Sequence, residues 1–126
     1  MKPLRQRLTR RNSVLWCNLT IASIDVGVYL VAGKSRLLPE MAGKHDGYCD
    51  IASSTILIDR ALTEDMAEQV LLHEIIHFVC FVAGVPMPAG DAEEEAIVNP
   101  LASALYDALK RNGLFLGPQR LLKQGC

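Results

Sequence analysis

The chain has 126 residues, of which 50% are apolar and 21% are charged, and its formal net charge is -1. This length fits one domain and leaves no room for a second full core. The composition is typical of a globular protein and argues against global disorder. A net charge so close to zero gives no overall attraction to nucleic acid or to a membrane, so neither is expected as a partner.

Positive charge is concentrated in the first twelve residues, which contain no acid. The basic residues there are Lys2, Arg5, Arg7, Arg10 and Arg11. Such a segment either contacts an acidic partner or is a solvated, frayed end, and the second interpretation is favoured for short basic ends. We expect residues 1–12 to be a flexible basic segment and residues 13–126 to form one domain. The chain shows no signal-peptide core and no apolar run that could span a bilayer, which indicates a cytoplasmic protein.

Four runs rich in β-branched and aromatic residues predict β-strands. They are residues 14–21, 26–31, 47–51 and 55–58. A turn near Asp25 separates the first two runs, and the small polar residues 52–54 make the last two a hairpin. Residues 32–46 hold two glycines, a proline and several charges, and are expected to form a loop.

Two helices are expected after these strands. The first has Thr63 as its N-cap, apolar residues at helical spacing, and Gly84 at its end. The second runs from Asp91 to about Asn112, and Pro100 falls within it. Either one bent helix accommodates this proline, or a short first segment ends and a new helix starts at the proline. The expected fold class is α+β, with a small antiparallel or mixed sheet of about three to four strands packed on the two helices.

The segment with the clearest chemistry is His73-Glu74-Ile75-Ile76-His77, in the second half of the first helix. Residues four apart on a helix are separated by about 40° of rotation and about 6 Å along the axis. His73 and His77 can therefore bind one zinc ion in tetrahedral geometry. Glu74 is rotated by about 100° from His73, so its carboxylate lies beside the metal and can act as general base on a zinc-bound water.

The alternative is that His73 and His77 are ordinary histidines of a partly buried helix. The motif lies in a well-capped helix, and two of the three histidines of the chain occur in it. A charged Glu74 would also be costly among its apolar neighbours without a partner. These features favour a metal site.

A third zinc ligand is expected from residues 91–95 at the start of the second helix, because an antiparallel return would bring them against the histidines. A helical wheel places Glu94 on the apolar face of this helix. That face comprises Val98, Leu101 and Leu105. However, Asp91 and Glu94 also have the spacing of a capping box, which would engage Glu94 with the backbone.

Glu95 is the competing ligand. Asn99 follows it by one turn and could hydrogen-bond a ligand histidine. Glu93 is assigned to a solvated first turn that the helix dipole favours. On these residues alone, Glu94 and Glu95 both remain candidates.

At this point the sequence resembles the gluzincin metallopeptidases, and within them the small ImmA/IrrE-like and related phage- or prophage-encoded zincins. The resemblance covers about residues 47–112. It rests on Thr55-Ile56-Leu57-Ile58-Asp59, Leu71-Leu72-His73-Glu74-Ile75-Ile76-His77, Gly84, and Glu95-x-x-x-Asn99 followed by Leu101-Ala102. It implies one zinc ion per chain bound by His73, His77 and Glu95, with Glu74 as the general base.

The resemblance also implies that residues 55–58 border the cleft, where an extended peptide could add as another strand. Gluzincins often have a tyrosine or histidine that stabilises the oxyanion. The candidates here are Tyr48, His45 and Tyr106. No motif assigns one of them, and a structural role is favoured for each.

The leading hypothesis is a zinc metallopeptidase whose substrate is a peptide or protein, such as a regulatory protein of a mobile element. The alternative is a catalytically inactive, zinc-stabilised regulatory or protein-binding module. Glu74 argues against this alternative, since a structural zinc has no use for a base. A structural site would also need a fourth ligand, for which Cys80 is the nearest candidate. The four cysteines, Cys17, Cys49, Cys80 and Cys126, form no C-x-x-C pair and are expected to be free thiols.

Overall fold

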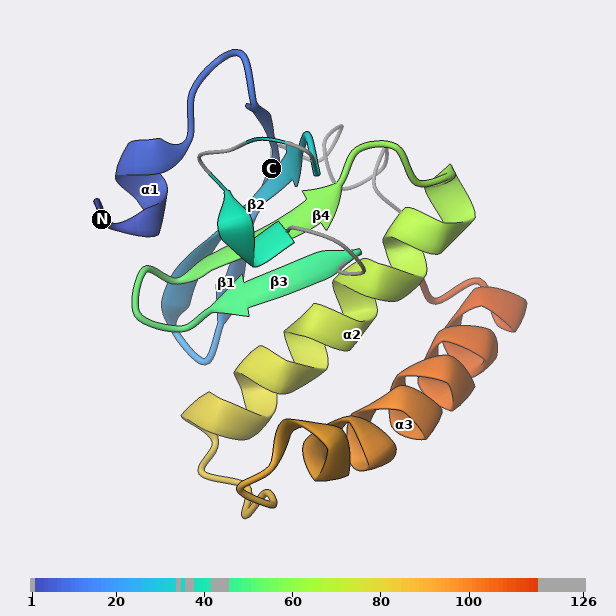
Figure 1. Cartoon of the computed structure of the whole chain (residues 1–126). Coiled ribbons are helices and arrows are strands. Elements are labelled where there is room, and N and C mark those ends of the chain that lie inside the picture. Colours follow the sequence, from blue (N-terminus) through green and yellow to red (C-terminus); the bar gives the residue numbers. More distant parts are fainter. Residues whose placement is uncertain (1, 34, 36–37, 42–45, 116–126) are drawn as a thin grey trace.

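The structure is a computed structural model of the chain, and it describes residues 2–33, 35, 38–41 and 46–115. The fold is α+β, as expected from the sequence (Figure 1). A four-stranded sheet is covered on one face by the long helix α2 (Glu64–Val82), and a second long helix, α3 (Asp91–Arg111), packs on α2. Among the described residues, no helix has the length and apolar character needed to cross a membrane.

The sheet is mixed. Its strands are β1 (Ser13–Ile21), β2 (Ile24–Val31), β3 (Gly47–Asp50) and β4 (Thr55–Asp59). They lie in the order β1-β2-β4-β3, with β2 and β4 parallel and the two outer pairs antiparallel. The turn expected near Asp25 instead occupies Ala22 and Ser23, which both have positive φ as a two-residue hairpin turn requires, and Asp25 belongs to β2.

The edge strand beside α2 is β3, which corrects the expectation that residues 55–58 border the cleft. β4 lies between β2 and β3, and its first four residues are fully buried, as is usual for a strand covered on both faces. Along an antiparallel pair of strands, hydrogen-bonded and non-hydrogen-bonded residue pairs alternate. The Asp59 N–H donates to the Asp46 C=O, so Asp46 and Asp59 form a hydrogen-bonded pair and the next pair along the strands is not hydrogen-bonded. The N–H and C=O groups of Gly47 and Cys49 therefore point away from β4, toward the outer edge of the sheet, where no described residue pairs with them.

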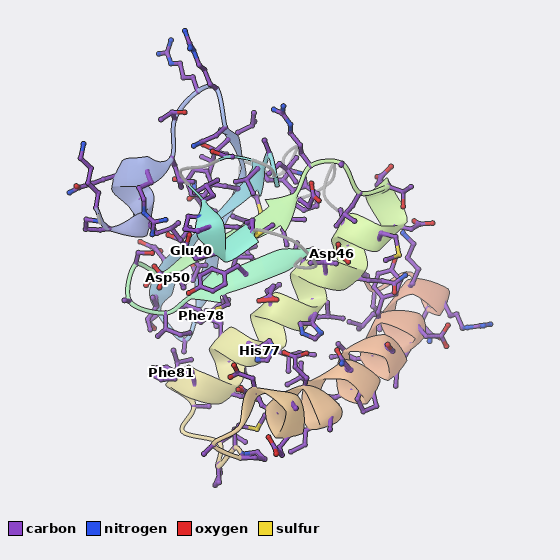
Figure 2. The ribbon with its side chains drawn as sticks, in the orientation of Figure 1. Glu40, Asp46, Asp50, His77, Phe78 and Phe81 are labelled. Carbon is purple, nitrogen blue, oxygen red and sulfur yellow. The ribbon has the colours of Figure 1, made fainter. Side chains whose placement is uncertain are left out.

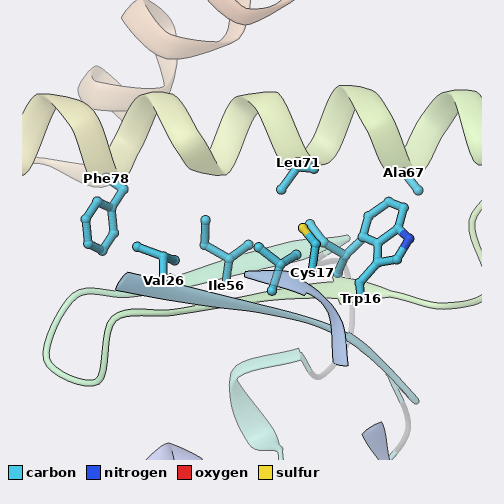
Figure 3. Close-up of a cluster of buried hydrophobic side chains, with 9 residues drawn as sticks. Trp16, Cys17, Val26, Ile56, Ala67, Leu71 and Phe78 are labelled. Atoms are coloured by element: carbon cyan, nitrogen blue, oxygen red, sulfur yellow. The ribbon is translucent and has the colours of Figure 1, made fainter. Parts of the chain in front are cut away.

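The main core lies between the sheet and α2 (Figure 3). Its buried side chains are Trp16, Cys17, Val26, Val28, Ile56, Ile58, Ala67, Leu71 and Phe78. The expected boundaries of α2 are confirmed: the Thr63 hydroxyl accepts a hydrogen bond from the Met66 N–H, and Gly84 follows the helix with a φ of 69°. Local signals at both ends thus define the helix that carries the two histidines.

The helix α3 is continuous through Pro100, so the single-helix alternative holds. Its N-cap is Gly90, which means that Asp91 is already helical and does not form the expected capping box with Glu94. The face that packs on α2 is formed by Val98, Ala102 and Tyr106. Leu101 and Leu105, which the helical wheel placed on the buried face, are exposed. The observed face is therefore rotated from the expected one.

The basic N-terminal segment is attached to the face of the sheet opposite α2. Residues Leu4–Arg7 form a short helix, α1, and Leu4 is buried in a small apolar cluster with Val31 and Leu57. Both terminal nitrogens of Arg7 bind the Glu40 carboxylate, at 2.8 and 2.6 Å. Residues 4–7 were expected to be part of a solvated, frayed end because of their charge. They are instead held on the sheet by the buried Leu4 and by the ion pair between Arg7 and Glu40.

Replacing Gly47 by Ala is expected to destabilise the edge of the sheet. A Cβ at this position would lie 2.5 Å from Val70 Cγ1 and 3.2 Å from Glu74 Cγ, so β3 would have to move away from α2. Overpacking of this kind costs about 1–3 kcal/mol. Urea unfolding would measure the loss, with Gly33→Ala as the control, since the atoms nearest to the Cβ added there belong to the Asp59 carboxylate, the first at 3.3 Å. Equal stability of the two variants would contradict the close approach of β3 to α2.

Candidate metal centre

The two histidines of α2 present the same ring nitrogen to one point in space. The Nε2 atoms of His73 and His77 are 3.1 Å apart, one helical turn along the chain. Both rings are partly buried. Burial is the main cause that lowers the pKa of His73, with His77 acting in the same direction and Glu95 opposing it. A lowered pKa favours the neutral imidazole, which is the form that binds metal.

The carboxylate of Glu95 closes this arrangement from α3. Its Oε2 lies 3.0 Å from His73 Nε2, and its Oε1 lies 2.7 Å from His77 Nε2. The antiparallel return of α3 places Glu95 there, as the sequence argument anticipated. Two imidazoles and one carboxylate, which are side chains able to ligate a metal, thus converge on one point from two helices.

Glu94 contacts the other side of the His77 ring. Its Oε1 lies 3.2 Å from His77 Nδ1. The sequence assigned the support of a ligand histidine to Asn99, but Glu94 makes this contact, while Asn99 lines the neighbouring cleft. A carboxylate that accepts from Nδ1 fixes the orientation and tautomer of a histidine whose Nε2 binds metal.

These contacts constrain the protons at the site. If the Nδ1 of a neutral His77 donates to Glu94, its Nε2 carries only a lone pair. That lone pair faces the negatively charged Glu95 oxygen at 2.7 Å. Two acceptors so close repel each other unless a proton or a metal cation lies between them. A proton on one of these atoms, or a metal cation between them, would remove this repulsion at the point where the three side chains meet.

Glu74 lies beside this point but on a different face of α2. Its side chain is only 7% exposed, lines the cleft, and makes no hydrogen bond with the described residues. Its carboxylate oxygen and one nitrogen of each histidine all lie within 4.8 Å of one another. Burial raises the pKa of Glu74 from 4.5 to about 7, with a further rise from Glu95 and an opposing effect of His77. The group can therefore accept or release a proton near neutral pH.

The histidines open into a cleft of about 770 Å³ between β3, α2 and α3. Its lining residues include Asp46, Gly47, Tyr48, Cys49 and Ile51 from the β3 region, Met66, Gln69, Val70 and Phe81 from α2, and Asp91, Asn99 and Ser103 from α3. Of the β3 residues, the sequence suggested only Tyr48, as one of three candidates for stabilising the oxyanion, and it indicated none of the others. Their approach depends on how β3 and β4 pair, which no local motif encodes.

The other candidates from the sequence have different surroundings. Tyr106 donates its hydroxyl to Glu68 at 3.2 Å in the α2–α3 interface, which is a structural role. The Tyr48 side chain packs with the apolar cluster on the far face of the sheet. His45 lies outside the described residues. Cys80 packs against the apolar cluster between α2 and α3, whereas Cys49 lines the cleft, where burial raises its pKa to about 12.

No family model, curated protein or solved structure matches this chain. The chemistry of the site is therefore inferred from its own donor atoms, charges and distances.

Proposed function

We propose that this protein is a zinc-dependent peptidase of the gluzincin type, with zinc held by His73, His77 and Glu95. The supporting observation is the convergence of two imidazole Nε2 atoms and one carboxylate, 2.7 to 3.1 Å apart. Donors that share a tetrahedral zinc ion at about 2.0–2.1 Å lie about 3.3 Å from one another. Small side-chain adjustments therefore suffice to admit the ion.

The donor set also suits a catalytic ion. Two histidines and one glutamate leave a fourth position open, as in zinc hydrolases, whereas structural zinc sites fill all four positions. Cys80, the fourth ligand that a structural site would use, packs instead against apolar residues of the α2–α3 interface. This argues against a catalytically inactive, zinc-stabilised module.

Glu74 would act as the general base and acid. When bound, zinc supplies Lewis acidity, which makes a water molecule more acidic and polarises the scissile carbonyl. The Glu74 carboxylate accepts a proton from the attacking water and passes it to the leaving amine. A pKa near the working pH is best suited to this exchange, and that of Glu74 is about 7. A buried carboxylate that faces a cleft and hydrogen-bonds no residue in the described part of the chain has no evident structural use.

The open edge of β3 would position the peptide. The outward N–H and C=O groups of Gly47 and Cys49 can pair with an extended chain, as in other cases of strand addition. The close approach of Gly47 to Glu74 places this edge beside the base. A peptide aligned along β3 would therefore pass the metal centre.

Metal removal tests the proposal directly. We expect one zinc ion per chain by elemental analysis and cleavage of an unstructured peptide mixture, detected by mass spectrometry. Dialysis against a chelator should abolish cleavage, and added zinc should restore it. Purified protein that neither contains nor takes up zinc yet stays folded by circular dichroism would contradict the metal site. Zinc binding without any cleavage would favour the inactive module.

A further inference from the structure

Among the residues that the structure describes, the lining of the cleft is strongly acidic. Its described lining residues include five carboxylates but no lysine or arginine. The carboxylates are Asp46, Glu74, Asp91, Glu94 and Glu95. A zinc ion would neutralise two of these negative charges and leave the cleft negative. A concave surface with walls of low dielectric constant concentrates such a field and attracts ligands of opposite charge.

Two of these carboxylates lie toward opposite ends of the cleft. Asp46 directly precedes Gly47, which approaches Val70 on α2. Asp91 begins α3, one turn before Glu94, which contacts His77. Val70 and His77 are about 10 Å apart along the axis of α2. Both aspartates are exposed, and neither forms an ion pair with a described residue.

Other features indicate that the cleft receives a ligand. Glu74 is buried, lines the cleft and has no hydrogen-bond partner among the described residues, none of which pairs with the outward backbone groups of β3. Apolar side chains also line the cleft, with Met66 and Val70 in the first half of α2 and Phe81 near its end. Phe81 is 66% exposed, and Figure 2 shows it well separated from Asp46 along α2. A peptide combining basic and apolar side chains complements this surface.

We propose that the cleft binds a basic peptide segment, with lysine or arginine near each end of the bound part and an apolar side chain between them. This substrate class rests on the proposed peptidase function. Asp46 and Asp91 attract the basic side chains, while the free groups of β3 hold the backbone. Because both aspartates are exposed, each contributes about two- to fivefold in affinity, and less as salt increases.

The test uses three fluorescently labelled peptides with the same apolar residues and with lysine, glutamine or glutamate at matched positions. Their binding to zinc-loaded Glu74→Gln protein is measured by anisotropy at low and high salt, and their cleavage by the native protein is followed in parallel. We expect the lysine peptide to bind best and the glutamate peptide worst. Asp46→Asn and Asp91→Asn should each reduce the preference for lysine. Glu93→Gln should not, since Glu93 belongs to the same acidic turn but does not line the cleft.

The outcomes separate this inference from the proposed function. Cleavage of all three peptides at similar rates would overturn the basic-peptide inference and leave the peptidase function standing. A preference for lysine that survives both aspartate substitutions would also overturn it. Salt-sensitive binding of the lysine peptide without cleavage would support the cleft assignment and contradict the peptidase function. Absence of both binding and cleavage would overturn both.

Discussion

Replacing Glu74 by Gln is expected to abolish peptide cleavage while zinc stays bound. Gln has nearly the same shape as Glu, but its amide cannot accept a proton from water or return one to a leaving amine. General acid-base groups contribute about 10²- to 10⁴-fold to rate. The proposed ligands His73, His77 and Glu95 are unchanged in this variant, so its zinc content should match that of the native protein.

The pKa of Glu74 provides a folding control for the same variant. Burial raises this pKa from 4.5 to about 7, so the folded state favours the protonated carboxyl. The associated stability is fully present below pH 4.5 and is lost as the pH rises through about 7. Gln remains neutral, so this loss should be absent from metal-free Glu74→Gln protein. We therefore expect the metal-free variant to unfold at an equal or higher temperature than native protein at pH 8.

Kinetics on a fluorogenic peptide and zinc analysis would be measured on the same preparations. Glu64→Gln is the matched control, since Glu64 is exposed in the first turn of the same helix and outside the cleft. Cleavage by the Glu74→Gln protein at more than about a tenth of the native rate would exclude Glu74 as the base. Loss of zinc with loss of activity would instead indicate that Glu74 is a ligand.

The fold features that could be predicted from sequence are those with local signals. The helix α2 has a hydroxyl cap at Thr63, apolar residues at helical spacing, and Gly84 at a positive φ. The proximity of His73 and His77 follows from helix geometry alone. The four strands were also indicated by composition, although the first turn lies two residues earlier than expected. Each of these features depends on residues close together in the chain.

The identity of the edge strand could not be predicted in this way. β4 pairs in parallel with β2, although the two strands are separated by β3 and a long connection. The hairpin signal links β3 to β4 but does not say which of them meets β2. The unbroken apolar run Ile56–Ile58 offered a signal for an inner strand, since strands buried on both faces lack alternation. That signal would have placed the cleft beside β3.

The sequence also could not predict which histidine atoms Glu94 and Glu95 contact, because these contacts depend on the rotation of α3 about its axis. Neighbouring residues on a helix differ by about 100°, so the rotation of α3 about its axis decides which of the two faces the histidines. Packing of Ala102 and Tyr106 on α2, rather than Leu101 and Leu105, sets the observed rotation. The family resemblance implied Glu95 as the third ligand, whereas no sequence motif indicated that Glu94 contacts His77.

Replacing Glu95 by Ala is expected to weaken zinc binding far more than replacing Glu94 by Ala. Glu95 spans both Nε2 atoms and is the only carboxylate of α3 in contact with His73 among the described residues. Glu94 contacts only Nδ1 of His77 and would act by fixing the ring. Loss of such a supporting group costs about 10- to 100-fold in metal affinity, and loss of a ligand should cost more than about 100-fold.

The corresponding Gln variants distinguish the two roles further. At position 94, the amide oxygen of Gln can still accept a hydrogen bond from His77 Nδ1, so Glu94→Gln should retain most of the affinity. At position 95, a neutral amide replaces a charged ligand, so Glu95→Gln should behave like Glu95→Ala. Competition with a chromophoric chelator would give the zinc Kd, and Glu93→Ala, an exposed neighbour, is the matched control.

Cobalt substitution would separate a change of ligand from a change of affinity. The visible absorption of bound Co²⁺ depends on the number and type of its ligands. We expect the native spectrum in Glu94→Ala protein at saturating cobalt and an altered or absent spectrum in Glu95→Ala protein. The opposite pattern would make Glu94 the third ligand. The carboxylate of Glu95, already 2.7 Å from His77 and 3.0 Å from His73, would then have to move away on metal binding.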